Sequence, residues 1–108
     1  MSLYIIAIFA LNEGKLARSI ELFKCIADSV KKNEPDCLRF EIMSSTNAET
    51  KQEEIVVLET FANQAAVELH QTSDVNVAFF KTIMDEELLA APPLFKATKS
   101  HGGLLSRV

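Results

Sequence analysis

The first predicted strand of the chain is apolar on both faces, and this limits the folds that the sequence can adopt. The run LYIIAIFA, residues 3–10, is short, rich in isoleucine and followed by a polar turn, which predicts a β-strand. Because side chains alternate between the two faces of a strand, one row is Leu3, Ile5, Ala7 and Phe9 and the other is Tyr4, Ile6, Ile8 and Ala10. A sheet built on this strand therefore needs cover on both sides.

Periodicity and turn residues divide the rest of the chain. Residues 15–33 repeat apolar side chains every three or four positions, which predicts a helix that ends before Pro35. Asn63 is a predicted N-cap for a short second helix. The other predicted elements are strands at 37–45 and 54–61 joined by a polar hairpin loop at 44–54, the short helix at 63–70, a longer helix after QTSD that ends at Pro92 and Pro93, and a last strand that begins at Leu94.

Two of these elements carry specific predictions of orientation. In strand 37–45, Leu38, Phe40 and Ile42 are expected on one face, with Cys37, Arg39, Glu41 and Met43 on the other. In the longer helix, the predicted buried stripe is Val77, Phe80, Met84 and Leu88.

The order of the elements is β-α-β-β-α-β, with the second helix in two pieces. This order indicates an α+β fold of the ferredoxin-like, split βαβ type, with a four-stranded antiparallel sheet and helices on one face only. The strand at 54–61 is also apolar on both faces, so the open face of the sheet would expose a large apolar surface. We therefore expect a homodimer that packs two open sheet faces together.

Length and composition favour one globular domain. The chain has 108 residues, of which we assign 3–98 to the domain and 99–108 to a C-terminal tail. A net charge of −4 argues against binding to nucleic acid, and no apolar run is long enough to span a membrane. With no signal peptide pattern, we expect a cytoplasmic protein with Cys25 and Cys37 as thiols in or near its core.

Three segments carry a resemblance to a known family. NEPDCLRFEI (33–42), LETFANQAAVELHQTSDV (58–75) and ALNEGK (10–15) resemble, in sequence and spacing, segments of the antibiotic biosynthesis monooxygenase superfamily, the dimeric α+β barrel proteins. Asp36 departs from the pattern, which has Gly there. The resemblance implies a dimeric barrel. Members include cofactor-independent oxygenases of quinols and phenols, haem-degrading enzymes, a sugar-signal isomerase and proteins without known activity.

His70 is the main candidate for catalysis. It lies at the rim of the apolar stripe of the short helix, where the resemblance implies a histidine that lines a pocket. A neutral imidazole can take a proton from a phenol or enol at neutral pH. Alternatively, His70 caps the C-terminal end of its own helix, where the helix dipole favours a cation.

Six other residues are candidates for substrate binding. Arg39 and Glu59 could form an anion anchor and a partner that orients His70, or they could belong to a cross-strand ion pair that includes Glu41. The remaining four could border an aromatic ligand or serve only as structural residues: Asn12, Phe9, Phe61 and Phe80.

The sequence gives little support for a metal or cofactor. It has two histidines, no CxxC spacing and no glycine-rich phosphate loop. The positions that correspond to the haem-degrading members hold Ala7, His70 and Phe80 and depart from their pattern. Our leading hypothesis is a cofactor-independent monooxygenase of a quinol-like or phenolic aromatic. The alternatives are an isomerase or tautomerase that uses the same histidine, and a non-catalytic barrel that binds a hydrophobic ligand or a protein.

Overall fold

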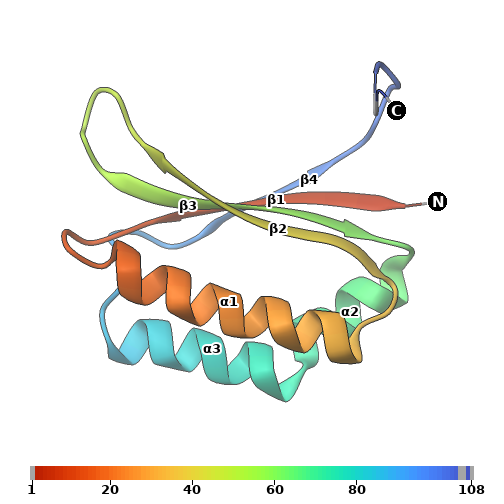
Figure 1. The fold of residues 1–108 in the computed structure, drawn as a ribbon, viewed down its shortest axis with the longest axis horizontal. Helices are drawn as coiled ribbons and strands as arrows, with labels where there is room; N and C mark the ends of the chain where they lie inside the picture. Colours follow the sequence, from red (N-terminus) through yellow and green to blue (C-terminus); the bar gives the residue numbers. More distant parts are fainter. Residues whose placement is uncertain (1, 105–106, 108) are drawn as a thin grey trace.

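A computed structural model describes residues 2–104 and 107 and shows a sheet with helices on one side (Figure 1). The sheet is antiparallel with strand order β2-β3-β1-β4. The elements are β1 (Leu3–Ala10), α1 (Leu16–Asn33), β2 (Cys37–Thr46), β3 (Glu53–Phe61), α2 (Gln64–Thr72), α3 (Asp74–Asp85) and β4 (Leu94–Thr98). The predicted α+β, ferredoxin-like fold with a four-stranded antiparallel sheet is confirmed.

The helices cover one face of the sheet, as predicted. Their side chains pack against the inner rows of β1 and β3, where Ala7, Phe9, Ile55 and Val57 are buried. The opposite face, which we call the outer face, carries the second apolar row of β1 and its β3 partners, and these side chains are partly exposed. The β2–β3 hairpin and the end of β4 rise on the outer side of the sheet (Figure 1).

The predicted faces of β2 are wrong at its first residues. A β-bulge between Cys37 and Arg39 inserts an extra residue into the strand. As a result, Cys37 packs against the core together with Phe40, whereas Leu38 points outward and is 59% exposed. The hairpin loop is also shorter than predicted, because the strands stay paired as far as Thr46 and Glu53.

The predicted stripe of the longer helix is wrong at two of its four positions, whereas Leu88 is buried and Phe80 is partly buried against the core. Val77 and Met84 are 58% and 70% exposed, and the buried side chains are Asn76, Phe79, Ile83 and, beyond the helix, Leu88. The chain breaks after α2, and the Ser73 side chain accepts a hydrogen bond from the Asn76 backbone N–H, which starts α3 in a new phase. The predicted cap of α2 is confirmed, since Asn63 accepts from Ala66 N–H at 2.9 Å.

Three further expectations concern the end of α3, the cysteines and the tail. Helix α3 ends at Asp85 rather than near Pro92, because Glu87 adopts a left-handed conformation with φ of 53°. Cys25 is exposed on α1 and not in the core. Of the predicted tail at 99–108, residues 105–106 and 108 lie outside the described residues.

Candidate active site

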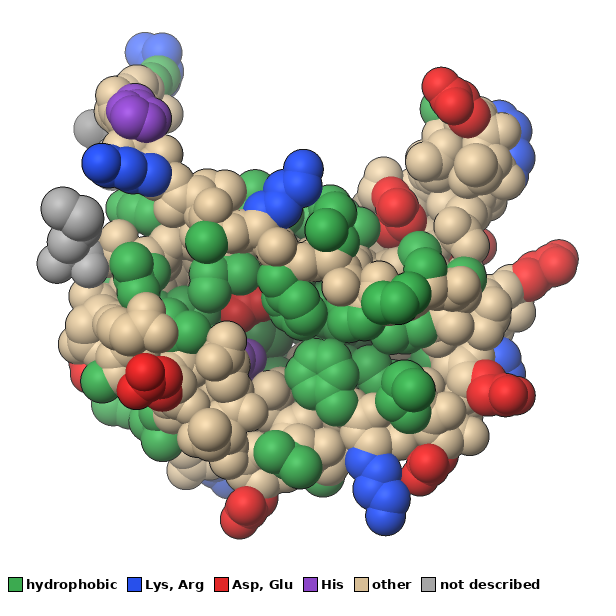
Figure 2. All heavy atoms as spheres, turned by 180° about the vertical axis from the view of Figure 1, so that it is seen from behind, with side chains coloured by type: hydrophobic (Ala, Val, Ile, Leu, Met, Phe, Trp, Pro, Cys, Tyr) green, Lys and Arg blue, Asp and Glu red, His purple; other side chains and the backbone are tan. Residues whose placement is uncertain are grey.

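A pocket of about 400 Å³ lies between the inner face of the sheet and the helices α2 and α3. Seen from behind, the molecule is hollowed there and hydrophobic side chains frame the recess (Figure 2). The pocket has a volume suited to a small organic molecule. Most of its lining is apolar, and four of its residues are polar: Glu59, His70, Gln71 and Asn76.

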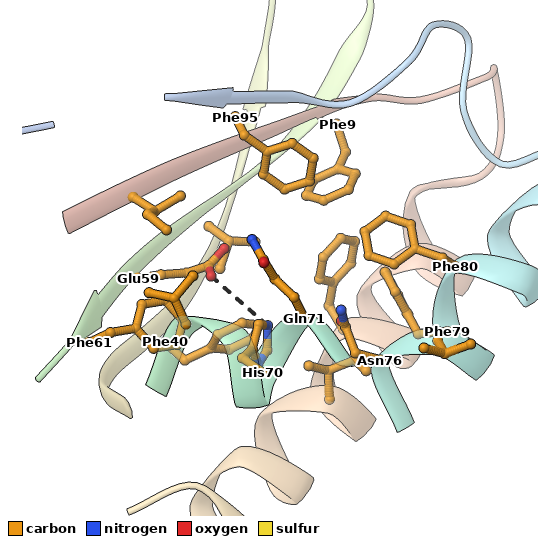
Figure 3. Close-up of a pocket in the computed structure, with 16 residues that line it drawn as sticks. Phe9, Phe40, Glu59, Phe61, His70, Gln71, Asn76, Phe79, Phe80 and Phe95 are labelled. Atoms are coloured by element: carbon orange, nitrogen blue, oxygen red, sulfur yellow. Dashed lines mark ion pairs between the residues drawn. The ribbon is translucent and has the colours of Figure 1, made fainter. Parts of the chain in front are cut away.

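Five phenylalanines make up a continuous aromatic wall. Phe9 contacts Phe23, Phe80 and Phe95, with ring centroids 4.9, 6.4 and 5.9 Å apart. Phe79 joins the same cluster through Phe23 at 4.8 Å and Phe80 at 5.3 Å. In Figure 3 the rings of Phe9, Phe80 and Phe95 lie across the pocket from His70. The wall favours a flat, apolar body for any ligand.

His70 lines the pocket. It is 8% exposed, and its ring is flanked by Phe40 and Phe61 at centroid distances of 5.6 and 5.5 Å. Its Nδ1 lies 2.9 Å from Oε1 of Glu34, a buried residue that follows α1. In the neutral ring, the tautomer with its hydrogen on Nδ1 is the one that can donate to the carboxyl oxygen of Glu34. Nε2 is therefore left as an acceptor that faces the pocket, and the ring does not serve as a cap of its own helix.

Glu59 lies on the inner face of β3, beside His70. Its Oε1 is 3.9 Å from His70 Nε2 (Figure 3). Burial and, to a smaller extent, the negative charge of Glu34 together raise the pKa of Glu59 from an ordinary 4.5 to about 7. Glu59 can therefore gain or lose a proton at neutral pH. The role predicted for it, to orient His70, belongs instead to Glu34.

Cys37 lies close to these carboxylates but is not suited to nucleophilic catalysis. Burial, together with the charges of Glu34 and Glu59, raises the pKa of its thiol to about 11. Since the thiolate is the reactive form of cysteine, Cys37 remains protonated and unreactive at neutral pH.

The structure brings five of the seven predicted site residues together: Phe9, Glu59, Phe61, His70 and Phe80. The other two lie elsewhere. Arg39 points to the outer face, where it forms an ion pair with Glu41 of the same strand at 2.5 Å. Asn12 donates hydrogen bonds to the carbonyl oxygens of Glu87 and Leu89 at 2.7 and 3.1 Å, and so holds the segment after α3 against the end of β1.

Sequence reasoning missed several residues of the site. Glu34 lies in the polar stretch KKNEPD, whose composition is that of an exposed loop, although the segment NEPDCLRFEI that resembles the family includes it. Gln71 and Asn76 are polar residues of the helical region for which the sequence predicted no role; both line the pocket (Figure 3), although only Asn76 is buried. Phe95 was predicted only as part of a strand, and its β4 position across from Ala7 places it over the cavity.

Comparisons with known proteins agree with this architecture. The family model described as antibiotic biosynthesis monooxygenase matches residues 2–82. The chain belongs to this family. A search of curated proteins finds no match.

Solved structures of the family's fold resemble the chain along most of its length. A proposed antibiotic biosynthesis monooxygenase from Caulobacter crescentus is 24% identical, with a TM-score of 0.79, and the match covers 94% of this chain and 91% of that one. The protein Rv0793 from Mycobacterium tuberculosis is 16% identical, with a TM-score of 0.77 and coverage of 95% and 98%. At these identities, the likeness shows the fold alone.

Within 2–104 and 107, no helix is long and apolar enough to cross a membrane. Among the same residues, no group of three or more histidine, cysteine, aspartate or glutamate side chains is arranged to hold a metal ion.

Proposed function

We propose that this protein is a cofactor-independent monooxygenase of a phenolic or quinol-like aromatic molecule. The observation that carries the proposal is the position of His70. Its Nδ1 is held by Glu34, and its Nε2 faces an aromatic pocket as a proton acceptor. Membership of the family and the apolar pocket support the same reaction class.

The chemistry follows from the removal of a proton. When Nε2 accepts the hydroxyl proton of a bound quinol, the ring becomes an electron-rich anion that can reduce O₂. One oxygen atom then enters the ring and the other leaves as water. A quinol and O₂ thus give a hydroxyquinone and water, and the quinol supplies all four electrons. The aromatic wall holds the ring and keeps bulk water away from the reacting anion.

The test is oxygen uptake by chelator-treated protein supplied with a panel of quinols and phenols. We expect saturable uptake of one O₂ per quinol consumed. Catalase should return no oxygen, because simple oxidation to the quinone would release hydrogen peroxide and the proposed reaction does not. Uptake at the rate of the protein-free control, or a return of oxygen with catalase, would contradict the proposal.

An isomerase or tautomerase is the second candidate, and the position of Glu59 favours it. Tautomerisation of an enol moves a proton from its oxygen to a carbon, which a base and an acid beside the same substrate can carry out. His70 Nε2 and Glu59 Oε1, which lie 3.9 Å apart, could fill these two roles. Exchange of substrate hydrogens for deuterium without oxygen uptake would identify this reaction. Saturable binding with neither exchange nor uptake would identify the third alternative, a non-catalytic binding protein.

The proposal includes a cytoplasmic homodimer. The outer face carries the apolar row of Ile6 and Ile8 on β1, paired with Leu58 and Val56 on β3, and the helices cover only the opposite face. A second copy of the chain would remove this row from water. The two free thiols are consistent with a reducing compartment.

Substitution of Ile6 by glutamate is expected to convert the dimer to a monomer, because it would place a carboxylate in the apolar interface. Lys96 lies opposite Ile6 on β4 and offers the new carboxylate a partner within the monomer, which favours retention of the fold. Sedimentation at micromolar concentration is the measurement, with Leu69→Glu on the exposed side of α2 as the matched control. A monomeric wild type, or a dimeric Ile6→Glu variant, would argue against this interface.

A further inference from the structure

The two proton acceptors of the pocket lie side by side. His70 Nε2, on α2, and Glu59 Oε1, on β3, are 3.9 Å apart, and both residues are buried. A single hydroxyl group carries one hydrogen and can satisfy only one of the two. The other acceptor would then be left without a partner in an apolar pocket, which is unfavourable.

The wall of the pocket opposite His70 is apolar. Figure 3 shows Phe9, Phe80 and Phe95 across from His70, whereas Asn76 stays near its helix and the Gln71 side chain extends into the pocket toward Glu59. A ligand with a second hydroxyl at the opposite end of its ring would place that group against phenyl rings. Such a group would lose its hydrogen bonds to water and gain none.

We propose that the pocket selects aromatic compounds with two hydroxyl groups on neighbouring carbons, that is, catechol-type ortho-dihydroxy aromatics. One hydroxyl donates to His70 Nε2 and its neighbour donates to the Glu59 carboxylate, while the rest of the ring packs against the phenylalanines. The inference builds on the proposed function, because it names the substrate class of the same site. Since the pKa of Glu59 is about 7, this carboxylate can also accept the second proton of the ligand at neutral pH.

The test compares two isomers, catechol and hydroquinone, which have the same atoms and differ only in the placement of one hydroxyl. Binding is measured by titration calorimetry without oxygen, so that no turnover occurs. We expect the wild type to bind the catechol about tenfold more tightly or better, the difference typical of a hydrogen bond to a charged group.

The variant Glu59→Met removes the second acceptor and keeps a side chain of similar length. We expect it to bind the two isomers with equal affinity. Glu68→Met, on the exposed side of α2, is the matched control and should keep the wild-type preference. Thermal unfolding of both variants verifies that they are folded.

Equal affinity of the wild type for both isomers, or a preference that survives in Glu59→Met, would overturn the inference. The binding preference tests catechol selection, and oxygen uptake tests the monooxygenase proposal, so the two can fail independently. Oxygen uptake on both isomers without a binding preference would uphold the monooxygenase and overturn catechol selection. Selective binding of the catechol without oxygen uptake would uphold catechol selection and overturn the monooxygenase proposal.

Discussion

Replacement of His70 by asparagine is expected to lower kcat for oxygen uptake by about 10²- to 10⁴-fold, the usual contribution of a general base. The asparagine amide can take the place of Nδ1 and donate to Glu34, which lies 2.9 Å from that atom. The variant therefore keeps the buried carboxylate paired and loses only the nitrogen that faces the pocket. Alanine would be a poorer choice, because it leaves Glu34 without a partner in the interior.

The matched control for this loss is His101→Asn, which changes the other histidine of the chain at an exposed position after β4. It should leave kcat unchanged. A folded His70→Asn protein with wild-type kcat would show that His70 has a structural role only. A folded variant with an unchanged KM and a much lower kcat is the outcome that the proposed base requires.

Substitution of Glu59 by glutamine is expected to stabilise the protein at alkaline pH, by about 3 kcal/mol above pH 8. The folded state raises the pKa of Glu59 from 4.5 to about 7, so between these values the folded chain binds more protons than the unfolded chain. The contribution of this group to stability is therefore complete below about pH 4.5. It is lost as pH rises through about 7, where the buried carboxyl must ionise.

Chemical denaturation of wild type and Glu59→Gln between pH 4.5 and 8.5 measures this effect as the difference between two free energies of unfolding. Glutamine resembles the protonated carboxyl, so the two proteins should be equally stable at pH 4.5 and diverge above it. The ionisable groups that lie around Glu59 are Glu34, His70 and Cys37, and all three are retained in both proteins. A difference that does not change with pH would show that Glu59 is not held neutral by the fold.

The main architecture follows from patterns that a single strand or helix contains. The order of the elements predicted a sheet with helices on one side, and Ala7 and Phe9 of the inner row of residues 3–10 are indeed buried. The errors arose where one residue changes the phase of a pattern. The bulge after Cys37 reverses the faces of β2 at its start, and the Ser73 cap restarts α3 so that Phe79 rather than Val77 is buried. Neither event has a clear signal in local composition.

Part of the site was predictable from the family resemblance. His70 and Glu59 belong to segments whose family resemblance suggested a pocket, and both lie in it. The partner of His70 could not be predicted from spacing, because Glu34 lies 36 positions away along the chain and next to Pro35, in a stretch with the composition of a surface loop. Only the folded chain, which places the segment after α1 beside His70 of α2, brings the two together.

The composition of the pocket wall has a consequence for its durability. Twelve of the described residues that line it have aromatic or aliphatic hydrocarbon side chains, and none of the lining residues is methionine, cysteine, tryptophan or tyrosine. Cys37 nearby is kept as a thiol with a pKa of about 11. The side chains most easily damaged by reduced oxygen species are thus absent from the wall or held in their least reactive form. If the proposed oxygenase reaction takes place in this pocket, its lining should therefore resist oxidation over repeated turnovers.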